Sequence, residues 1–273
     1  MKQLQTIQEV HKMFNTTGSN PLLVTCNDLN DWVCKYDKFP NYLFNELVAS
    51  EFGKLWGINI PETSLIKVKR EHVPVERFPK LQLNLFDKDC FGSLYIENTK
   101  EIDLTFTPLF KEKSFRDKVL VKSDFLKIAL FDLWLANEDR NYNNNNLLMH
   151  YAKDNSLSFY AIDHVAIFNS SFLNYGIQAL TENESILNTD LARLLFANDR
   201  KLGETVNKLI ENFYLCTKDC ETSLVNILAL VPNSWAIDTV EIRSKIEQYL
   251  FNDAWKKQCE DHFRAFIHSL ILS

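Results

Sequence analysis

The segment from Asn137 to Leu148 concentrates carboxylate and amide side chains, which handle protons and bind hard metal ions. Asp139 has an amide, Asn144, five positions later, and an apolar segment then leads to a second acid, Asp163. Metal-dependent phosphoryl transfer uses one carboxylate for the acceptor hydroxyl, and an amide with a second carboxylate to hold Mg²⁺ against the phosphates. This order of side chains therefore predicts a phosphoryl-transfer site.

An ordinary loop is the competing interpretation of the Asn-rich segment. Asn and Asp tolerate turn geometry and bond to their own backbone, so the run from Asn143 to Asn146 is weak evidence by itself. Asp163 strengthens the prediction because it follows Tyr160-Ala161-Ile162, which we expect to be buried. An acid at the end of a buried strand is costly unless it is paired, and a metal ion is the simplest partner.

Lys35 and Glu46 form a second, independent pattern. Lys35 lies in the stretch 31–36, where apolar and polar residues alternate as in a β-strand, and Glu46 lies in a following segment of helical spacing. In kinases a strand lysine contacts the nucleotide phosphates and a helix glutamate steadies it, ahead of an Asp-x4-Asn loop. Either residue alone would be interpreted as an exposed charge, so the prediction rests on their combination.

The composition is that of a globular protein. The chain has 273 residues, of which 46% are hydrophobic and 12% aromatic, enough to bury a large core. The formal net charge is -6 and the basic residues are scattered, so we expect no nucleic-acid partner. No apolar run approaches the roughly 20 residues of a membrane span, and the first residues do not resemble a secretory signal. We therefore expect a cytoplasmic protein without membrane association.

Six cysteines lie far apart along the chain. In the expected compartment their simplest interpretation is as reduced thiols. Cys216 and Cys220 form a C-x3-C pattern that could supply two metal ligands, but no second Cys or His pair of suitable spacing lies near them. Helix packing is the favoured interpretation of this pair.

A first, β-rich lobe is predicted to carry Lys35 and Glu46. Its expected elements are two strands that form a hairpin, a helix that ends at Gly57, and a further strand: Leu22–Cys26, Asp31–Tyr36, Tyr42–Trp56 and Ser64–Val68. The segment from Arg70 to Lys118 is less regular, although Ile102–Phe106 alternates as a strand would.

A second, mainly helical lobe is predicted to carry the acid-and-amide loop. Ser123 is a good N-cap for a strongly apolar helix that ends at Asn137. Two strands, Leu147–Tyr151 and Leu157–Ile162, follow the loop.

From about Asn188 onward the pattern is helical, with predicted breaks near Cys216 and at Pro232. We therefore predict an α+β fold with two lobes. A small β-rich lobe with one helix occupies residues 1–120, and a mainly α-helical lobe occupies residues 121–273.

Six motifs follow one another along most of the chain: Trp32–Tyr36, Asn45–Ala49 with Gly57–Glu62, Phe91–Ser93, Asn137–Leu148, Ala161–His164 and Val231–Trp235. In this order they resemble the HipA-like kinases, specifically the small stand-alone domains of that family. The ordered series is far more specific than any one motif. The resemblance implies the two-lobed kinase-like fold that the family shares with the protein and phosphatidylinositol kinases.

The resemblance also implies a role for each matching residue. Asp139 would be the catalytic aspartate, Lys35 the nucleotide lysine and Glu46 its partner. Asn144 and Asp163 would be the metal ligands. ATP and Mg²⁺ are the implied cofactors, and the implied acceptor is a Ser or Thr hydroxyl of a protein.

The family's phosphate loop would lie before Leu22, where Gly18 and Ser19 are the candidates for nucleotide binding. Some relatives are growth-arresting toxins, so the resemblance further implies an antitoxin or other partner protein.

Two residues in the loop allow alternative roles. Asn146 competes with Asn144 for the metal because it lies directly before the predicted strand, although the five-residue spacing from Asp139 favours Asn144. Arg140 could stabilise the charge of transferred phosphate, but a structural ion pair with a buried acid is the favoured interpretation.

Two functional hypotheses follow. The residues Lys35, Asp139, Asn144 and Asp163 favour an active kinase. The phosphate loop, with Gly18 as its single glycine, favours a kinase-like module that binds nucleotide or a partner without transferring phosphate.

Overall fold

The first sheet carries the amino-terminal strands. The computed structural model describes residues 1–16 and 20–272. Six strands have the order β1-β5-β6-β4-β3-β2, with β1 parallel to β5 and the other neighbours antiparallel. They are β1 (Lys2–Gln5), β2 (Lys12–Met13), β3 (Leu22–Thr25), β4 (Asp31–Lys35), β5 (Thr63–Lys67) and β6 (Cys90–Leu94). The predicted hairpin is confirmed as β3 and β4, which places Lys35 at the end of an inner strand.

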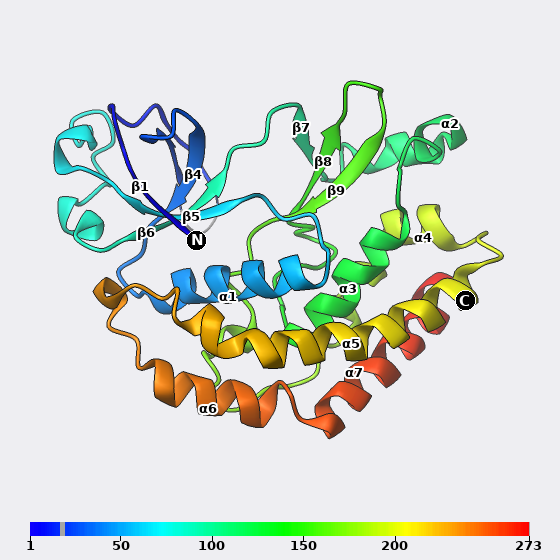
Figure 1. Ribbon diagram of the computed structural model, residues 1–273. Helices are drawn as coiled ribbons and strands as arrows, with labels where there is room; N and C mark the ends of the chain where they lie inside the picture. Colours follow the sequence, from blue (N-terminus) through cyan, green and yellow to red (C-terminus); the bar gives the residue numbers. More distant parts are fainter. Residues whose placement is uncertain (17–19, 273) are drawn as a thin grey trace.

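A second sheet, with three strands in the order β7-β8-β9, follows the first one along the chain (Figure 1). Its strands are β7 (Thr99–Glu101), β8 (Leu147–Tyr151) and β9 (Leu157–Ala161). The chain crosses between the sheets at residues 95–98. A second link is Asn59, in the chain that leads into β5, whose carbonyl oxygen accepts the N–H of Ala161 at 2.9 Å and whose amide donates to the carbonyl of Phe159 at 3.1 Å. Two separate links therefore fix one sheet against the other.

Most of the helices lie below the two sheets in Figure 1, and α1 lies between the first sheet and α5. The helices are α1 (Asn41–Leu55), α2 (Lys113–Arg116), α3 (Ser123–Leu135), α4 (Asp190–Phe196), α5 (Leu202–Leu228), α6 (Thr239–Tyr249) and α7 (Asp253–Phe266). The predicted end of α1 is confirmed, because Gly57 has a left-handed backbone with φ 63° and its N–H bonds to the carbonyl of Lys54 at 3.0 Å. The mixed α+β architecture is as predicted.

Two hydrophobic cores divide the molecule. One joins the first sheet, through residues such as Val24, Trp32 and Ile66, to the segment from Val73 to Phe86. The other joins α1 to the helices, as in the contact of Phe52 on α1 with Trp134 on α3, whose ring centroids are 5.4 Å apart. By its packing α1 belongs with the helical part, so this core fixes the position of Glu46 relative to α3 and the loop that follows it.

The carboxyl-terminal part differs from the prediction in one helix. No break occurs near Cys216, because α5 is continuous from Leu202 to Leu228. Its buried residues Phe213, Thr217, Cys220 and Leu224 keep helical spacing through this region, and that pattern favours an unbroken helix. Cys220 is therefore a helix-packing residue, as the favoured interpretation of the C-x3-C pattern has it.

Two local predictions were wrong. Ser123 is the first residue of α3 and does not cap it; the N-cap position is Lys122, without a side-chain cap bond. The alternating stretch Ile102–Phe106 forms no strand. The Asp103 carboxylate accepts the N–H groups of Thr105 and Phe106 at 2.8 and 2.9 Å, and this local bonding turns the chain instead.

The motif Val231–Trp235 ties the carboxyl-terminal part to the first sheet. Ser234 Oγ accepts the N–H of Asp89 at 3.1 Å and donates to its carboxylate at 2.5 Å. Trp235 donates its indole N–H to the carbonyl of Asp89 at 2.6 Å. Asp89 directly precedes β6, so the segment after α5 anchors the strand that leads into the connection between the sheets.

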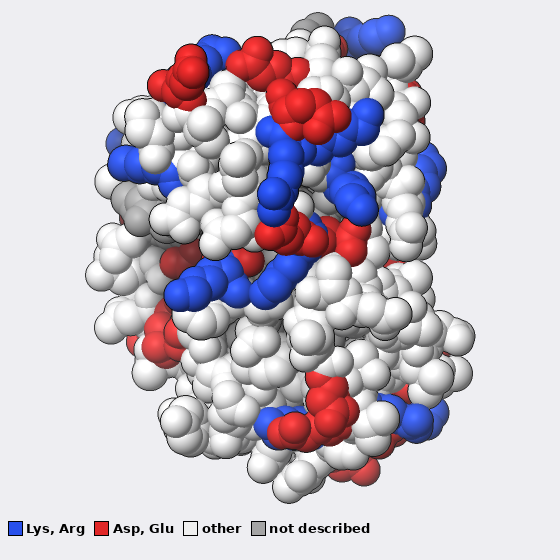
Figure 2. Space-filling view, turned by 90° about the vertical axis from the view of Figure 1, so that its left-hand side faces the viewer, with Lys and Arg blue, Asp and Glu red and all other residues white. Residues whose placement is uncertain are grey.

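The surface carries charges of both signs. On the face in Figure 2, Lys and Arg side chains adjoin Asp and Glu side chains in a band across the middle of the molecule. Across residues 1–16 and 20–272, none of the helices has both the length and the apolar character needed to cross a bilayer.

Candidate active site

Lys35, Glu46 and Asp163 form an ion cluster that joins β4, α1 and the segment after β9. Nζ of Lys35 contacts Oε1 of Glu46 and lies 2.9 Å from Oδ1 of Asp163. The side chains of Lys35 and Glu46 are 10% and 3% exposed, whereas that of Asp163 is 33% exposed. The cluster is therefore closed on the side of α1 and accessible to solvent at Asp163.

The charges in this ion cluster stabilise one another. Burial alone would lower the pKa of the Lys35 ammonium, but the carboxylates of Asp163 and Glu46 outweigh it and raise that pKa above its usual value. Burial would also raise the pKa of Glu46, but Lys35 and His164 outweigh it and hold that pKa well below its usual value. Both side chains are therefore charged at neutral pH.

Helix α1 also fixes the backbone that follows Asp163. The N–H of His164 donates to Oε1 of Glu46 at 3.1 Å, and the amide of Asn45 donates to the carbonyl of Val165 at 2.7 Å. His164 is itself buried, which lowers its pKa and favours the neutral imidazole. The position of Asp163 thus depends on polar residues of α1 as well as on β9.

Asp139 is held by the amides of its own loop. Asn144 and Asn146 both donate to Oδ2 of Asp139, at 2.9 and 3.1 Å. No hydrogen bond from the described residues reaches its other oxygen, Oδ1, and the side chain is partly exposed. One carboxylate oxygen is therefore fixed while the other is free to accept a proton or a hydrogen bond.

Arg140, next in sequence, is completely buried and connects three segments. Its Nε lies 2.9 Å from Oδ2 of Asp132 on α3, and its Nη1 donates to the carbonyl oxygens of Asn146 and, at 3.0 Å, of Ile162. The carboxylate of Asp132 also accepts the amide of Asn137 at 2.9 Å. Arg140 thus fixes the loop of Asp139 to the residue that precedes Asp163. Its contact with Asp132 is the structural ion pair that the sequence favoured.

The backbone is strained at two of the candidate residues. Asp163 has φ 58° and Asn146 has φ 44°, in the left-handed region that non-glycine residues seldom adopt. Such strain persists only where surrounding contacts impose it, and it gathers at functional sites. Here Arg140 bonds to the carbonyl of Asn146 and to that of Ile162, directly before Asp163.

The predicted site residues therefore form two groups. Lys35, Glu46 and Asp163 are in direct contact, and Asp139 contacts both candidate amides. Among the described residues no hydrogen bond or ion pair joins the two groups directly. Arg140 links them through the carbonyls of Asn146 and Ile162, and the N–H of Ile162 also donates to the carbonyl of Asn146 at 3.1 Å. Gly18 and Ser19 lie outside the described residues.

The sequence interpretation missed two residues of the site. Asp132 anchors Arg140, and Asn45 holds the backbone after Asp163. The available signal was a single polar residue inside an apolar helix: Asp132 stands between Phe131 and Leu133. Such a residue must find a buried partner, which only the fold identifies.

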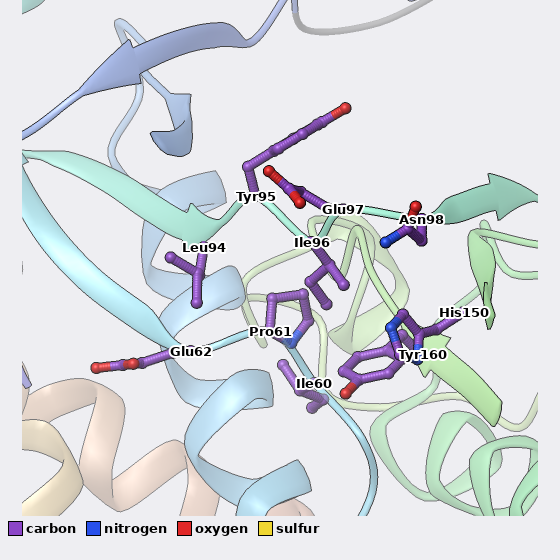
Figure 3. Close-up of a pocket in the computed structure, with 10 residues that line it drawn as sticks. All are labelled: Ile60, Pro61, Glu62, Leu94, Tyr95, Ile96, Glu97, Asn98, His150 and Tyr160. Atoms are coloured by element: carbon purple, nitrogen blue, oxygen red, sulfur yellow. The ribbon is translucent and has the colours of Figure 1, made fainter. Parts of the chain in front are cut away.

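A pocket of about 390 Å³ lies where the two sheets join (Figure 3). It is lined by residues 60–62, by Leu94 at the end of β6, by the connection 95–98, and by His150 and Tyr160 of the second sheet. Lys35, Asp139 and Asp163 are not among its lining residues, so this pocket is separate from the two charged groups.

Comparison with known proteins gives a family and a fold. The model of the HipA-like kinase family matches residues 7–267. The structure is similar to that of the Helicobacter pylori proinflammatory kinase CtkA, with a TM-score of 0.54 and 14% identity over 95% of this chain and 99% of that one.

It is also similar to HipA of Shewanella oneidensis MR-1, solved with HipB and its operator DNA. The TM-score is 0.50 and the identity 12%, over 93% of this chain and 68% of that one. At these identities the likeness shows the fold alone. A search of curated proteins gives no match.

Proposed function

Because the chain belongs to the family of HipA-like kinases, we propose that it transfers the γ-phosphate of ATP, with Mg²⁺, to a Ser or Thr hydroxyl of a protein. The observation that carries the proposal is the contact of Lys35 with Asp163 at 2.9 Å, between residues far apart in the sequence. This contact supports a nucleotide lysine and a metal-binding acid at one site.

The donor atoms that remain free fit a magnesium ion. Asp163 uses Oδ1 for Lys35, which leaves Oδ2 as a ligand, and Asn144 uses its amide nitrogen for Asp139, which leaves its carbonyl oxygen. Oxygen ligands of this kind suit Mg²⁺, which would neutralise charge on the phosphates. No three His, Cys, Asp or Glu side chains in the described chain form a metal site, so bound phosphate and water would complete the coordination.

In this proposal Asp139 orients and deprotonates the acceptor hydroxyl through its free Oδ1, while Asn144 and Asn146 hold Oδ2. Lys35 binds phosphate oxygens, and Glu46 keeps its ammonium in place. Gly18 and Ser19 would contribute to nucleotide binding as part of the phosphate loop. The nucleotide would bind between the two predicted lobes, residues 1–120 and 121–273.

A kinase-like module that binds nucleotide or a partner without transfer is the second candidate. It is favoured by the phosphate-loop segment, where Gly18 is the single glycine. The proposal also includes a partner protein of the antitoxin type, because the HipA structure from Shewanella oneidensis was solved together with HipB.

Titration calorimetry with ATP tests the nucleotide and metal roles. We expect Mg²⁺ to tighten binding by about tenfold or more over EDTA, because Asp163 and Asn144 reach the phosphates only through the metal. Asp163→Asn should abolish this difference, and Asp154→Asn, in the exposed turn between β8 and β9, is the matched control. Asn144→Ala and Asn146→Ala are compared in the same way, and the variant that loses the effect of Mg²⁺ on ATP affinity identifies the amide that binds the metal. Equal ATP affinity in Mg²⁺ and EDTA would remove the metal role from these residues.

A further inference from the structure

A groove of about 260 Å³ lies beside the loop that carries Asp139. Three segments line it: the chain from Leu104 to Lys111, the loop residues Tyr142 and Asn145, and the beginning of α4 around Arg193. Asn145 donates its amide to the carbonyl of Ile102 at 2.9 Å, which joins the loop to the chain just before the first of these segments. The groove therefore lies on the loop that carries Asp139 and on the chain bonded to it.

The position of the groove suits the residues that flank the acceptor Ser or Thr in a substrate polypeptide. The neighbours of Asn145, Asn144 and Asn146, are the two residues that hold Oδ2 of Asp139. A hydroxyl that reaches the free Oδ1 belongs to a polypeptide whose flanking residues must lie along the adjacent surface. The groove offers such a surface within the same loop.

The charges that line the groove do not balance. Arg193 pairs with Asp190, with 3.3 Å between Nη1 and Oδ1, and donates to Asn188 at 3.1 Å. Lys111 is exposed, and its ammonium has no carboxylate partner among the described residues. In a chain of net charge -6, the groove thus carries one uncompensated positive charge. That charge attracts an acidic side chain and repels a basic one.

Exposed apolar side chains add a second property. Leu104 is 83% exposed and Tyr142 is 48% exposed, and both line the groove. Large apolar groups that stay in water beside a few fixed charges are typical of a surface that binds a peptide.

We propose that this groove binds the protein acceptor, and that Lys111 selects Ser or Thr sites flanked by an acidic residue, with an apolar neighbour on Leu104 and Tyr142. This inference rests on the proposed kinase function and names its class of substrate.

The test is an array of peptides that each contain one Ser in a Gly and Ala background, with Glu, Lys or Leu at each flanking position. Two quantities are measured with the full chain: the phosphate transferred from ATP to each peptide, and the amount of labelled protein that each peptide retains. We expect Glu to exceed Lys by about three- to fivefold at one flanking position, as for an exposed ion pair. Lys111→Glu should reverse this preference, and Lys118→Glu, an exposed lysine outside the groove, should leave it unchanged.

The two readouts separate the groove from the kinase activity. Phosphate transfer without a preference for Glu over Lys, or with a preference that Lys111→Glu leaves intact, would overturn the proposed role of the groove. The proposed kinase activity would stand. Suppose instead that peptides with Glu retain more protein, that this preference reverses in Lys111→Glu, and that no phosphate is transferred. This result would support the proposed role of the groove and contradict the proposed kinase activity. If neither transfer nor retention distinguishes Glu from Lys, the groove proposal is wrong.

Discussion

Two charged clusters lie at Asp163, one that includes it and one that bonds to the residue before it, and they differ in their access to solvent. In the ion cluster, Lys35 contacts Asp163, whose side chain is 33% exposed. In the second, Arg140 contacts Asp132, and their side chains are 0% and 4% exposed. The ion cluster can exchange partners with a ligand, whereas Arg140 and Asp132 are shielded from solvent and contact groups of their own protein.

From this difference in exposure we expect the ion cluster to bind a ligand and the cluster of Arg140 to position the loop. Lys35 has two acidic partners, so a phosphate oxygen can replace one of them while Glu46 keeps the ammonium in place. Arg140 bonds to a carboxylate and to backbone carbonyls on both sides of the site, so removing its guanidinium takes the charged partner from Asp132 and a donor from two carbonyls. We therefore expect substitutions of Arg140 to lower mainly the stability of the fold, and substitutions of Lys35 to lower mainly the affinity for nucleotide.

The largest expected effect is on stability, from Arg140→Met. Removing the guanidinium leaves the buried Asp132 carboxylate without a charged partner, which should lower the free energy of unfolding by about 3–5 kcal/mol. Arg116→Met is the matched control, because Arg116 bonds to backbone carbonyls at the surface and should cost about 1 kcal/mol. Urea unfolding measures both. A loss below that of the control would contradict the positioning role.

Glu46→Gln should have the next largest effect, with a characteristic pH dependence. The pKa of Glu46 is held below its usual 4.5, so its ionised form stabilises the fold above that pH and the contribution is lost as the pH falls through the folded value. We expect a loss of about 2–3 kcal/mol at neutral pH, because the variant leaves Lys35 with one partner. Urea unfolding at successive pH values below 4.5 should show the wild type approaching the variant. A gap that stays constant would show that the Glu46 carboxylate is not ionised in the fold.

The smallest effect in free energy is expected from Lys35→Met in the Glu46→Gln background. Lys35 is only 8% exposed, so removing it alone would leave a buried carboxylate, whereas the double variant removes the pair together. ATP affinity should fall about tenfold relative to Glu46→Gln alone, because a charge-assisted bond to phosphate is lost. Calorimetry measures it, with Lys54→Met on the exposed side of α1 as the control. Unchanged ATP affinity in the double variant would assign Lys35 to structure only.

Sequence patterns predicted the elements that bear most of the candidate residues. Period-two alternation identified β4 and therefore Lys35, and apolar periodicity identified α1 and therefore Glu46. The fold class followed from the change between these patterns. These signals are local, because each depends on residues within one strand or helix.

What the patterns missed depends on contacts between distant segments. The carboxylate of Asp132 and the amide of Asn45 acquire their roles only from partners brought near by folding. Strand β6 was not predicted because Cys90-Phe91-Gly92-Ser93-Leu94 lacks clear alternation, and its neighbours β4 and β5 supply the pairing. Period-two alternation also predicted a strand at Ile102–Phe106, where the hydrogen bonds of Asp103 form a turn instead.

The most direct test of the central claim compares Asp139→Asn with Asp163→Asn for ATP binding and for phosphate transfer. Asp139 contacts the acceptor and not the nucleotide in this account, so Asp139→Asn should leave ATP affinity within a few-fold while transfer falls by about two orders of magnitude or more. Asp163→Asn should damage both. Wild-type protein that binds ATP but yields no more phosphorylated product or hydrolysed ATP than Asp139→Asn would contradict the kinase and favour the nucleotide-binding module.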